Sequence, residues 1–185
     1  MDKDEAIPII AASAVASEKR TGLPAEITAA QCALESGWLK SSPGNNCFGI
    51  KHAARHTEKQ LLQTREFFDT AEHATAWMSR IPGREIISET GRVVNGRREF
   101  KVRDWFAAYP TLADCFADHA RLITSGKPYR RAWESFIVHR SWEKLLRDIA
   151  PVYATAPTYE TSVLSVLRGG LRDAIQNLKI AERTT

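Results

Sequence analysis

Long apolar runs, dense basic clusters and metal-binding cysteine patterns are all missing from this sequence of 185 residues. Without an apolar run of about 20 residues, no segment is predicted to span or insert into a membrane. Without Lys and Arg runs interleaved with aromatic residues, we do not expect nucleic acid as a partner. Without a Cys-x-x-Cys pair or a Cys/His cluster, the sequence predicts no metal site.

Cysteine is scarce, and its three copies are Cys32, Cys47 and Cys115. Cys32 and Cys115 fall on apolar faces of predicted helices, and Cys47 takes the place of a hydrophobic residue in a loop. A buried free cysteine behaves as a small hydrophobic residue. We therefore expect reduced, buried side chains, with a disulfide between Cys32 and Cys47 as the alternative.

The composition that remains is that of a globular protein, with 43% hydrophobic and 26% charged residues. The length suits one domain with one sizeable core, which we place over residues 1–185. The net charge of +4 indicates an acidic partner such as an anionic polymer, unless it serves solubility alone.

Helical spacing of apolar residues covers most of the chain, and a β-rich segment interrupts it. Helices are expected at residues 4–20, 24–36 and 71–80, and then repeatedly between 111 and 178. Strands are expected at 61–68, 85–90 and 99–105, with a hairpin turn at Asn95-Gly96. The pattern predicts a mainly α, α+β fold, in which a small β lobe at about 60–105 forms a cleft with the helices.

Four local predictions concern single positions. Asp4 is expected to cap the first helix and Asp69 the helix at 71–80. Ile137 is expected to face inward, and Gly169-Gly170 to weaken or kink the last helix.

Glu35 is the most informative residue, because it lies in the last turn of a half-buried helix that Ser36-Gly37 ends. The negative end of the helix dipole and partial burial both disfavour an ionised carboxylate there. A carboxylic acid that keeps its proton near neutral pH suits general acid catalysis. Position alone favours an ordinary surface glutamate at a frayed helix end, so a catalytic role depends on the neighbouring sequence.

That neighbouring sequence resembles a known family. The segment Ala-Leu-Glu-Ser-Gly-Trp at 33–38, followed by Asn-Asn-Cys-Phe-Gly-Ile-Lys at 45–51, is similar to the glucosaminidase family of peptidoglycan hydrolases (glycoside hydrolase family 73). The peptidoglycan-cutting domain of the flagellar rod protein belongs to this family. The resemblance spans about Ile9 to Leu178, and its weaker motifs follow in the family's order: Thr64–Phe67, Trp105–Phe106, Tyr109–Leu112, Phe116–His119, Pro128–Tyr129, and Tyr153–Thr155 with Tyr159.

The resemblance implies a lysozyme-like helical domain in which Glu35 is the general acid, with no metal or organic cofactor. It implies a second carboxylate at Glu66, and substrate contacts from Asn46, Phe48, Tyr129, Tyr153 and Tyr159. Phe48 and Tyr129 are equally consistent with core packing. Ala156 stands where the family commonly has aspartate, and His119 is interpreted as a packed helix residue rather than a ligand.

The second carboxylate has a rival. In many family members the Thr-x-Glu strand runs directly into an Asn-Gly turn, and here the segment before Asn95-Gly96 holds Arg92 at the glutamate position, with Glu89 as the nearest acid. We prefer Glu66 because Thr64–Phe67 matches as a unit. The substrate's own acetamido group is a further alternative.

The resemblance implies hydrolysis of the β-1,4 bond between N-acetylglucosamine and N-acetylmuramic acid in peptidoglycan glycan strands. A lytic transglycosylase, a muramidase and an inactive wall-binding module are the alternatives. The acidic start, Met1–Glu5, is unlike a basic signal peptide, so we expect action on the cell wall without an encoded secretory route. We expect a monomer, delivered by a larger assembly.

Overall fold

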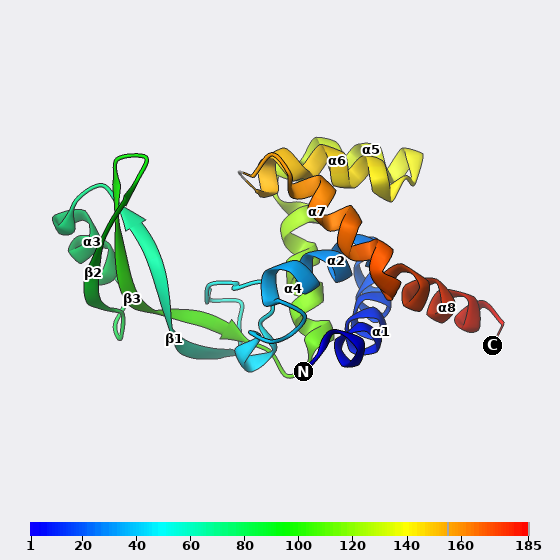
Figure 1. The fold of residues 1–185 in the computed structure, drawn as a ribbon, viewed down its shortest axis with the longest axis horizontal. Coiled ribbons are helices and arrows are strands. Elements are labelled where there is room, and N and C mark those ends of the chain that lie inside the picture. The colour runs from blue at the N-terminus through cyan, green and yellow to red at the C-terminus, as the bar shows by residue number, and fades with distance from the viewer. Residues whose placement is uncertain (155, 185) are drawn as a thin grey trace. The chain divides into compact units, whose positions relative to one another are not determined.

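The computed structural model describes residues 1–154 and 156–184, and over these residues it is mainly helical with one three-stranded antiparallel sheet (Figure 1). The chain divides into two compact units. The helical unit combines Met1–Phe48 with Tyr109–Thr185, and the β unit is Gly49–Ala108. The mainly α, α+β fold is confirmed, and the β segment is longer at both ends than the predicted 60–105.

The helical unit has helices joined by short turns. Its helices are α1 (Lys3–Thr21), α2 (Ala25–Ser36), α4 (Leu112–Ser125), α5 (Arg130–His139), α6 (Trp142–Tyr153), α7 (Tyr159–Val166) and α8 (Arg172–Arg183). Single 3₁₀ turns occur at Pro43–Asn45 and Lys127–Tyr129. No helix in the described part of the chain is both long and apolar enough to cross a membrane.

Helix α1 begins earlier than predicted, because Asp2 and not Asp4 is its cap. The Asp2 carboxylate accepts a hydrogen bond from the Glu5 backbone N–H at 2.9 Å, and the Glu5 carboxylate accepts one from the Asp2 N–H at 3.0 Å. This reciprocal capping box satisfies two backbone donors that the first helical turn leaves free. Asp4 instead lies in the first turn, where its negative charge complements the helix dipole.

Helix α2 is the buried centre of the helical unit. Its residues 25–33 are all buried, and α1, α4, α6, α7 and α8 pack against it. Four alanines, together with Thr28, Cys32 and Ser36, keep this helix narrow enough for close approach on several sides. Gly37 ends it in the left-handed conformation with φ 59°, as Ser36-Gly37 predicts, and so fixes Glu35 in the last turn.

The last helical region is interrupted as predicted. A π-helical segment at Leu167–Leu171 contains Gly169-Gly170 and separates α7 from α8. Glycine weakens a regular α-helix, and π-helical turns occur as local insertions of this kind. The prediction for Ile137 on α5 is wrong: that side chain is 47% exposed, and Phe136 is the buried residue.

The β unit consists of β1 (Glu58–Phe68), α3 (Ala71–Met78), β2 (Glu85–Val94) and β3 (Arg97–Ala108), in the sheet order β1-β3-β2. Asn95 and Gly96 both have positive φ, 51° and 77°, which is the backbone of the tight hairpin turn that the sequence predicts. Thr70, not Asp69, caps α3, since its hydroxyl accepts a hydrogen bond from the His73 N–H at 3.1 Å.

One sheet face of the β unit carries a small core. Phe68, Phe100 and Val102 of the sheet pack with Ala74 and Met78 of α3. Glu66 pairs with Phe100 in the β1–β3 register, so it lies on this same face. The sheet therefore presents Glu66 beside an apolar cluster, in the interior of a strand.

Candidate active site

Glu35 is the penultimate residue of α2. Its side chain is exposed, yet the protein atoms that desolvate the carboxyl group raise its pKa above the ordinary value of 4.5. No described residue donates a hydrogen bond to this carboxyl group or forms an ion pair with it. A carboxyl group without a partner, at the negative end of a helix, favours its protonated form.

Two stacked tyrosines lie near Glu35. The rings of Tyr153 and Tyr159 have centroids 5.4 Å apart and planes inclined by 24°. Burial raises the pKa of both hydroxyls above their ordinary value, and the negative charge of Glu35 raises them further. Glu35 is therefore close enough to act electrostatically on both rings, which stay neutral hydroxyl donors.

Each tyrosine hydroxyl has a fixed partner in the interior. The hydroxyl of Tyr159 accepts a hydrogen bond from the Gln31 amide at 2.9 Å, and Gln31 lies one helical turn before Glu35 on α2. The hydroxyl of Tyr153 lies 3.1 Å from Nε2 of His119 on α4. These bonds fix the hydroxyl positions, since buried polar groups need hydrogen-bond partners.

His119 is a packed and neutral histidine, as the sequence interpretation has it. It is 1% exposed, its ring stacks on Phe48 with centroids 3.9 Å apart, and burial lowers its pKa to about 3. Among the described residues, its Nδ1 has no hydrogen-bond partner. The ring centroids of Phe48 and Phe116 are 5.5 Å apart, so one side of the Phe48 ring packs against the core.

The other predicted contact residues of the helical unit are mostly buried. Tyr129 is 8% exposed and Asn46 is 4% exposed. Burial raises the pKa of Tyr129, and this hydroxyl acts electrostatically on Tyr153 and Tyr159, which places it in the same cluster. Beside Asn46, the Asn45 amide donates to the backbone oxygens of Tyr109 and Pro110 and anchors the loop.

The three cysteines are free and buried, which confirms the expectation of reduced side chains. Sγ of Cys47 lies 3.8 Å from Sγ of Cys115. Burial, together with the neighbouring Cys115 and Cys32, raises the pKa of Cys47, so this group stays a thiol. No group of three or more His, Cys, Asp or Glu side chains in the described part of the chain is arranged to hold a metal ion.

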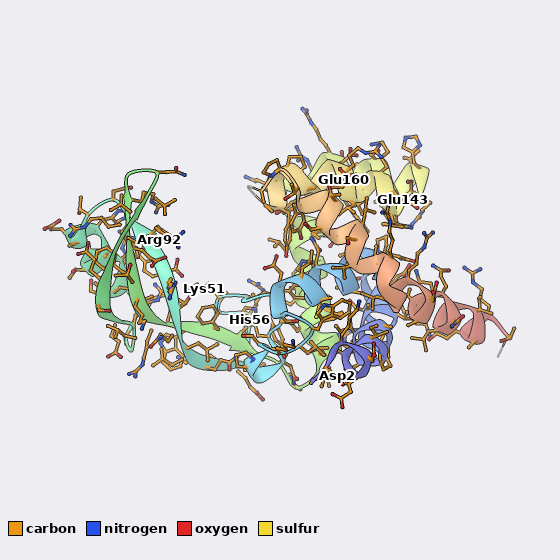
Figure 2. All side chains as sticks on the ribbon, viewed as in Figure 1. Asp2, Lys51, His56, Arg92, Glu143 and Glu160 are labelled. Atoms are coloured by element: carbon orange, nitrogen blue, oxygen red, sulfur yellow. The ribbon has the colours of Figure 1, made fainter. Side chains whose placement is uncertain are left out.

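In the β unit, Glu66 is half of an ion pair. Its Oε1 lies 2.6 Å from Nζ of Lys51, which is labelled in Figure 2. Nζ of Lys51 also lies 2.6 Å from Oδ2 of Asp104, and Asp104 pairs with Arg84. Glu66 thus belongs to a cluster with two anions and two cations.

The match to known families covers most of the chain. Residues 11–170 match the glucosaminidase family, described as mannosyl-glycoprotein endo-beta-N-acetylglucosaminidase. The chain belongs to the glucosaminidase family. It is therefore a glycoside hydrolase. No curated protein matches the chain significantly.

Solved structures share the glucosaminidase fold. The catalytic domain of the autolysin Auto from Listeria monocytogenes has 20% identity and a TM-score of 0.67, covering 94% of this chain and 86% of that chain. A mutant peptidoglycan hydrolase from Sphingomonas sp. A1 has 22% identity and a TM-score of 0.59, covering 94% and 98%. The glycoside hydrolase domain of Salmonella typhimurium FlgJ has 20% identity and a TM-score of 0.58, covering 100% and 92%.

Within this glucosaminidase, the two candidate second carboxylates differ in their partners. Both oxygens of Glu89 on β2 are held by the Arg98 guanidinium, each at 2.6 Å. Glu66 is held through Oε1 alone, and no described residue donates a hydrogen bond to its Oε2. Of these two candidates, Glu66 is therefore the one with a carboxylate oxygen that has no protein partner among the described residues.

Gln31, Lys51, Arg84 and Asp104 belong to these clusters but were not singled out as site residues from the sequence. Gln31 is a buried amide on an apolar helix stripe, and that irregularity is a usable signal. Asp104 is a fully buried acid between strand residues, which alternation alone does not explain. Lys51 is the last residue of the loop motif, but its partners lie 15 and 53 residues away in the chain.

Proposed function

We propose that this chain is a peptidoglycan hydrolase that cleaves the β-1,4 bond between N-acetylglucosamine and N-acetylmuramic acid, as an endo-β-N-acetylglucosaminidase of the cell wall. The family match supports the reaction class, and the related autolysin and peptidoglycan hydrolases support the substrate. The observation that carries the proposal is Glu35, a carboxyl group with a raised pKa and no hydrogen-bond partner among the described residues, near the buried Tyr159 and the half-buried Tyr153.

In this proposal Glu35 protonates the glycosidic oxygen as the bond breaks. Tyr153, positioned by His119, lines the site near that bond. Tyr159, Tyr129, Phe48 and Asn46 bind or shape the sugar site, as the family motifs imply.

Glu66 is proposed as the second carboxylate, which activates water or stabilises positive charge on the sugar. Its free Oε2 supports this role over Glu89, whose two oxygens are both bound to arginine. The acetamido group of the substrate is the alternative source of this assistance.

The test is digestion of purified peptidoglycan sacculi by the wild type and by Glu35→Gln, with products identified by mass spectrometry. Reducing N-acetylglucosamine ends from the wild type and almost none from Glu35→Gln are expected. The matched control is Glu134→Gln, an exposed glutamate on α5 of the same unit, which should match the wild type.

The alternatives give other products. Anhydro-muramic ends would identify a lytic transglycosylase, and reducing N-acetylmuramic acid ends a muramidase. Equal sugar release by the wild type and Glu35→Gln, with binding to sacculi retained, would identify an inactive wall-binding module.

A further inference from the structure

Lys51 is the centre of an ion-pair cluster in the β unit, since its ammonium contacts two carboxylates at once. Its Nζ lies 2.6 Å from Glu66 and 2.6 Å from Asp104. The two carboxylates differ in environment: the side chain of Asp104 is 0% exposed, whereas that of Glu66 is 31% exposed. Lys51 therefore joins a buried acid to a partly exposed one.

Asp104 is a fixed anchor for Lys51. It also accepts hydrogen bonds from the Trp105 backbone N–H at 2.7 Å and from Arg84. Burial acts to raise the pKa of Asp104. The charge of Lys51 and the hydrogen bonds from Lys51, the Trp105 backbone and Arg84 outweigh this effect, so the pKa is lowered. Asp104 is therefore an anion at neutral pH, and it keeps the ammonium group in place.

The backbone and stem of Lys51 are fixed as well. Lys51 forms an antiparallel bridge with Phe106, and Nζ lies 4.3 Å from the centroid of that ring. On either side of the bridge, the N–H of His52 donates to Trp105 and the N–H of Ala107 donates to Ile50, both at 3.0 Å. Both ends of this long side chain are thus held, which removes most of its conformational freedom before it meets Glu66.

Burial of Asp104 does not require Glu66. Asp104 already has Arg84, Lys51 and a backbone N–H as partners, and Arg84 is itself held 4.0 Å above the Trp77 ring of α3. The ion pair between Lys51 and Glu66 is an additional contact on the more exposed side of the cluster. Glu85, another acid of the sheet, forms a simple two-residue pair with Arg103 at the surface.

We propose that Lys51 is a positioning residue that holds Glu66 by Oε1 and leaves Oε2 free for the reaction, with Asp104 and Arg84 as its buried anchor. This inference rests on the proposed function, in which Glu66 is the second carboxylate. Lys51 itself does not contact the reacting atoms. Its effect on catalysis is transmitted entirely through the position of Glu66.

A double-mutant cycle tests this route. The variants are Lys51→Met, Glu66→Gln and their combination, assayed for kcat and KM on peptidoglycan, with thermal unfolding of each. Lys51→Met is expected to lower kcat about tenfold or more with KM nearly unchanged, because a misplaced catalytic group slows the chemical step. In the Glu66→Gln background the same change is expected to alter kcat less than about twofold, because the group that Lys51 positions is already lost.

Lys51→Arg is the conservative variant, since it keeps a cation between the two carboxylates, and it should recover most of kcat. If Lys51→Met does not fold, Lys51→Arg replaces it in the double-mutant cycle. Any loss of kcat that Lys51→Arg causes must then likewise vanish in the Glu66→Gln background. Equal fold-losses with and without the Glu66 carboxylate would overturn the inference and leave the hydrolase proposal intact. Full activity of Glu66→Gln would also overturn it, whereas full activity of Glu35→Gln would overturn the proposed function itself.

Discussion

Glu35 in the helical unit and Glu66 in the β unit have opposite surroundings. Glu35 lies in the last turn of a buried helix, has no hydrogen-bond partner among the described residues, and has a pKa that desolvation raises. Glu66 lies within strand β1, two residues before its end, and contacts a lysine at 2.6 Å. Environments that differ in this way let two identical side chains take different parts in acid and base chemistry.

The largest effect is expected from Glu35→Gln, which isolates the helical side of the comparison. Removing the acid proton should lower kcat by about a thousandfold, within the range that general acid catalysis contributes. The side chain is exposed and has no hydrogen-bond partner among the described residues, so the unfolding temperature should stay within a few degrees of the wild type. An activity loss accompanied by unfolding would remove the support for a catalytic role.

A smaller effect is expected from Glu66→Gln, which isolates the β side. We expect a loss of kcat of about ten- to a hundredfold, because the acetamido group of the substrate can partly replace this carboxylate. Glu89→Gln is the matched change on the same sheet and should stay within about twofold of the wild type. The reverse ranking of these two variants would assign the second carboxylate to Glu89.

The next effect concerns stability and comes from His119, which contacts the hydroxyl of Tyr153 near Glu35. Its folded pKa of about 3 lies below the ordinary 6.5, so between these values the unfolded chain binds a proton that the folded chain does not. Stability therefore rises with pH across this window, by about 1.4 kcal/mol per pH unit from this residue. Urea unfolding at several pH values should show a shallower dependence for His119→Gln, and an unchanged slope would contradict the buried neutral assignment.

The smallest effect is expected from Tyr159→Phe, which leaves the stacked ring in place and removes its hydroxyl. The buried Gln31 amide then loses its acceptor, at a cost of about 1–3 kcal/mol. Combining it with Gln31→Leu should recover part of this loss, because both polar partners are then removed. Additive losses in denaturant unfolding would show that the two residues do not act as a pair.

The two regions also differ in how well the sequence predicts them. Gly37 and Asn95-Gly96 correctly mark a helix end and a hairpin, because these backbone conformations depend on a few adjacent residues. The cap at Asp2 was missed since Asp4 competes with it two residues later. Ile137 fits the apolar stripe of its helix but is exposed, because the spacing of apolar residues does not determine which part of a helix face another element covers.

The side-chain partners were the least predictable part. Gln31 meets Tyr159 across 128 residues, and Lys51 meets Asp104 across 53. Periodicity places such residues on a face but does not select the partner on another element. Glu35 was found because the family motif surrounds it, whereas the contacts of Gln31 with Tyr159 and of His119 with Tyr153 depend on how the helices pack.

The most direct test of the account is the titration of the Glu35 carboxyl group itself. Carbon-13 NMR of the side-chain carboxyls, with Glu35→Gln to assign the signal, measures its pKa in the folded protein. The account predicts a midpoint clearly above 4.5, the ordinary value of this group. A midpoint at or below that value would contradict the claim that Glu35 is held protonated as the catalytic acid.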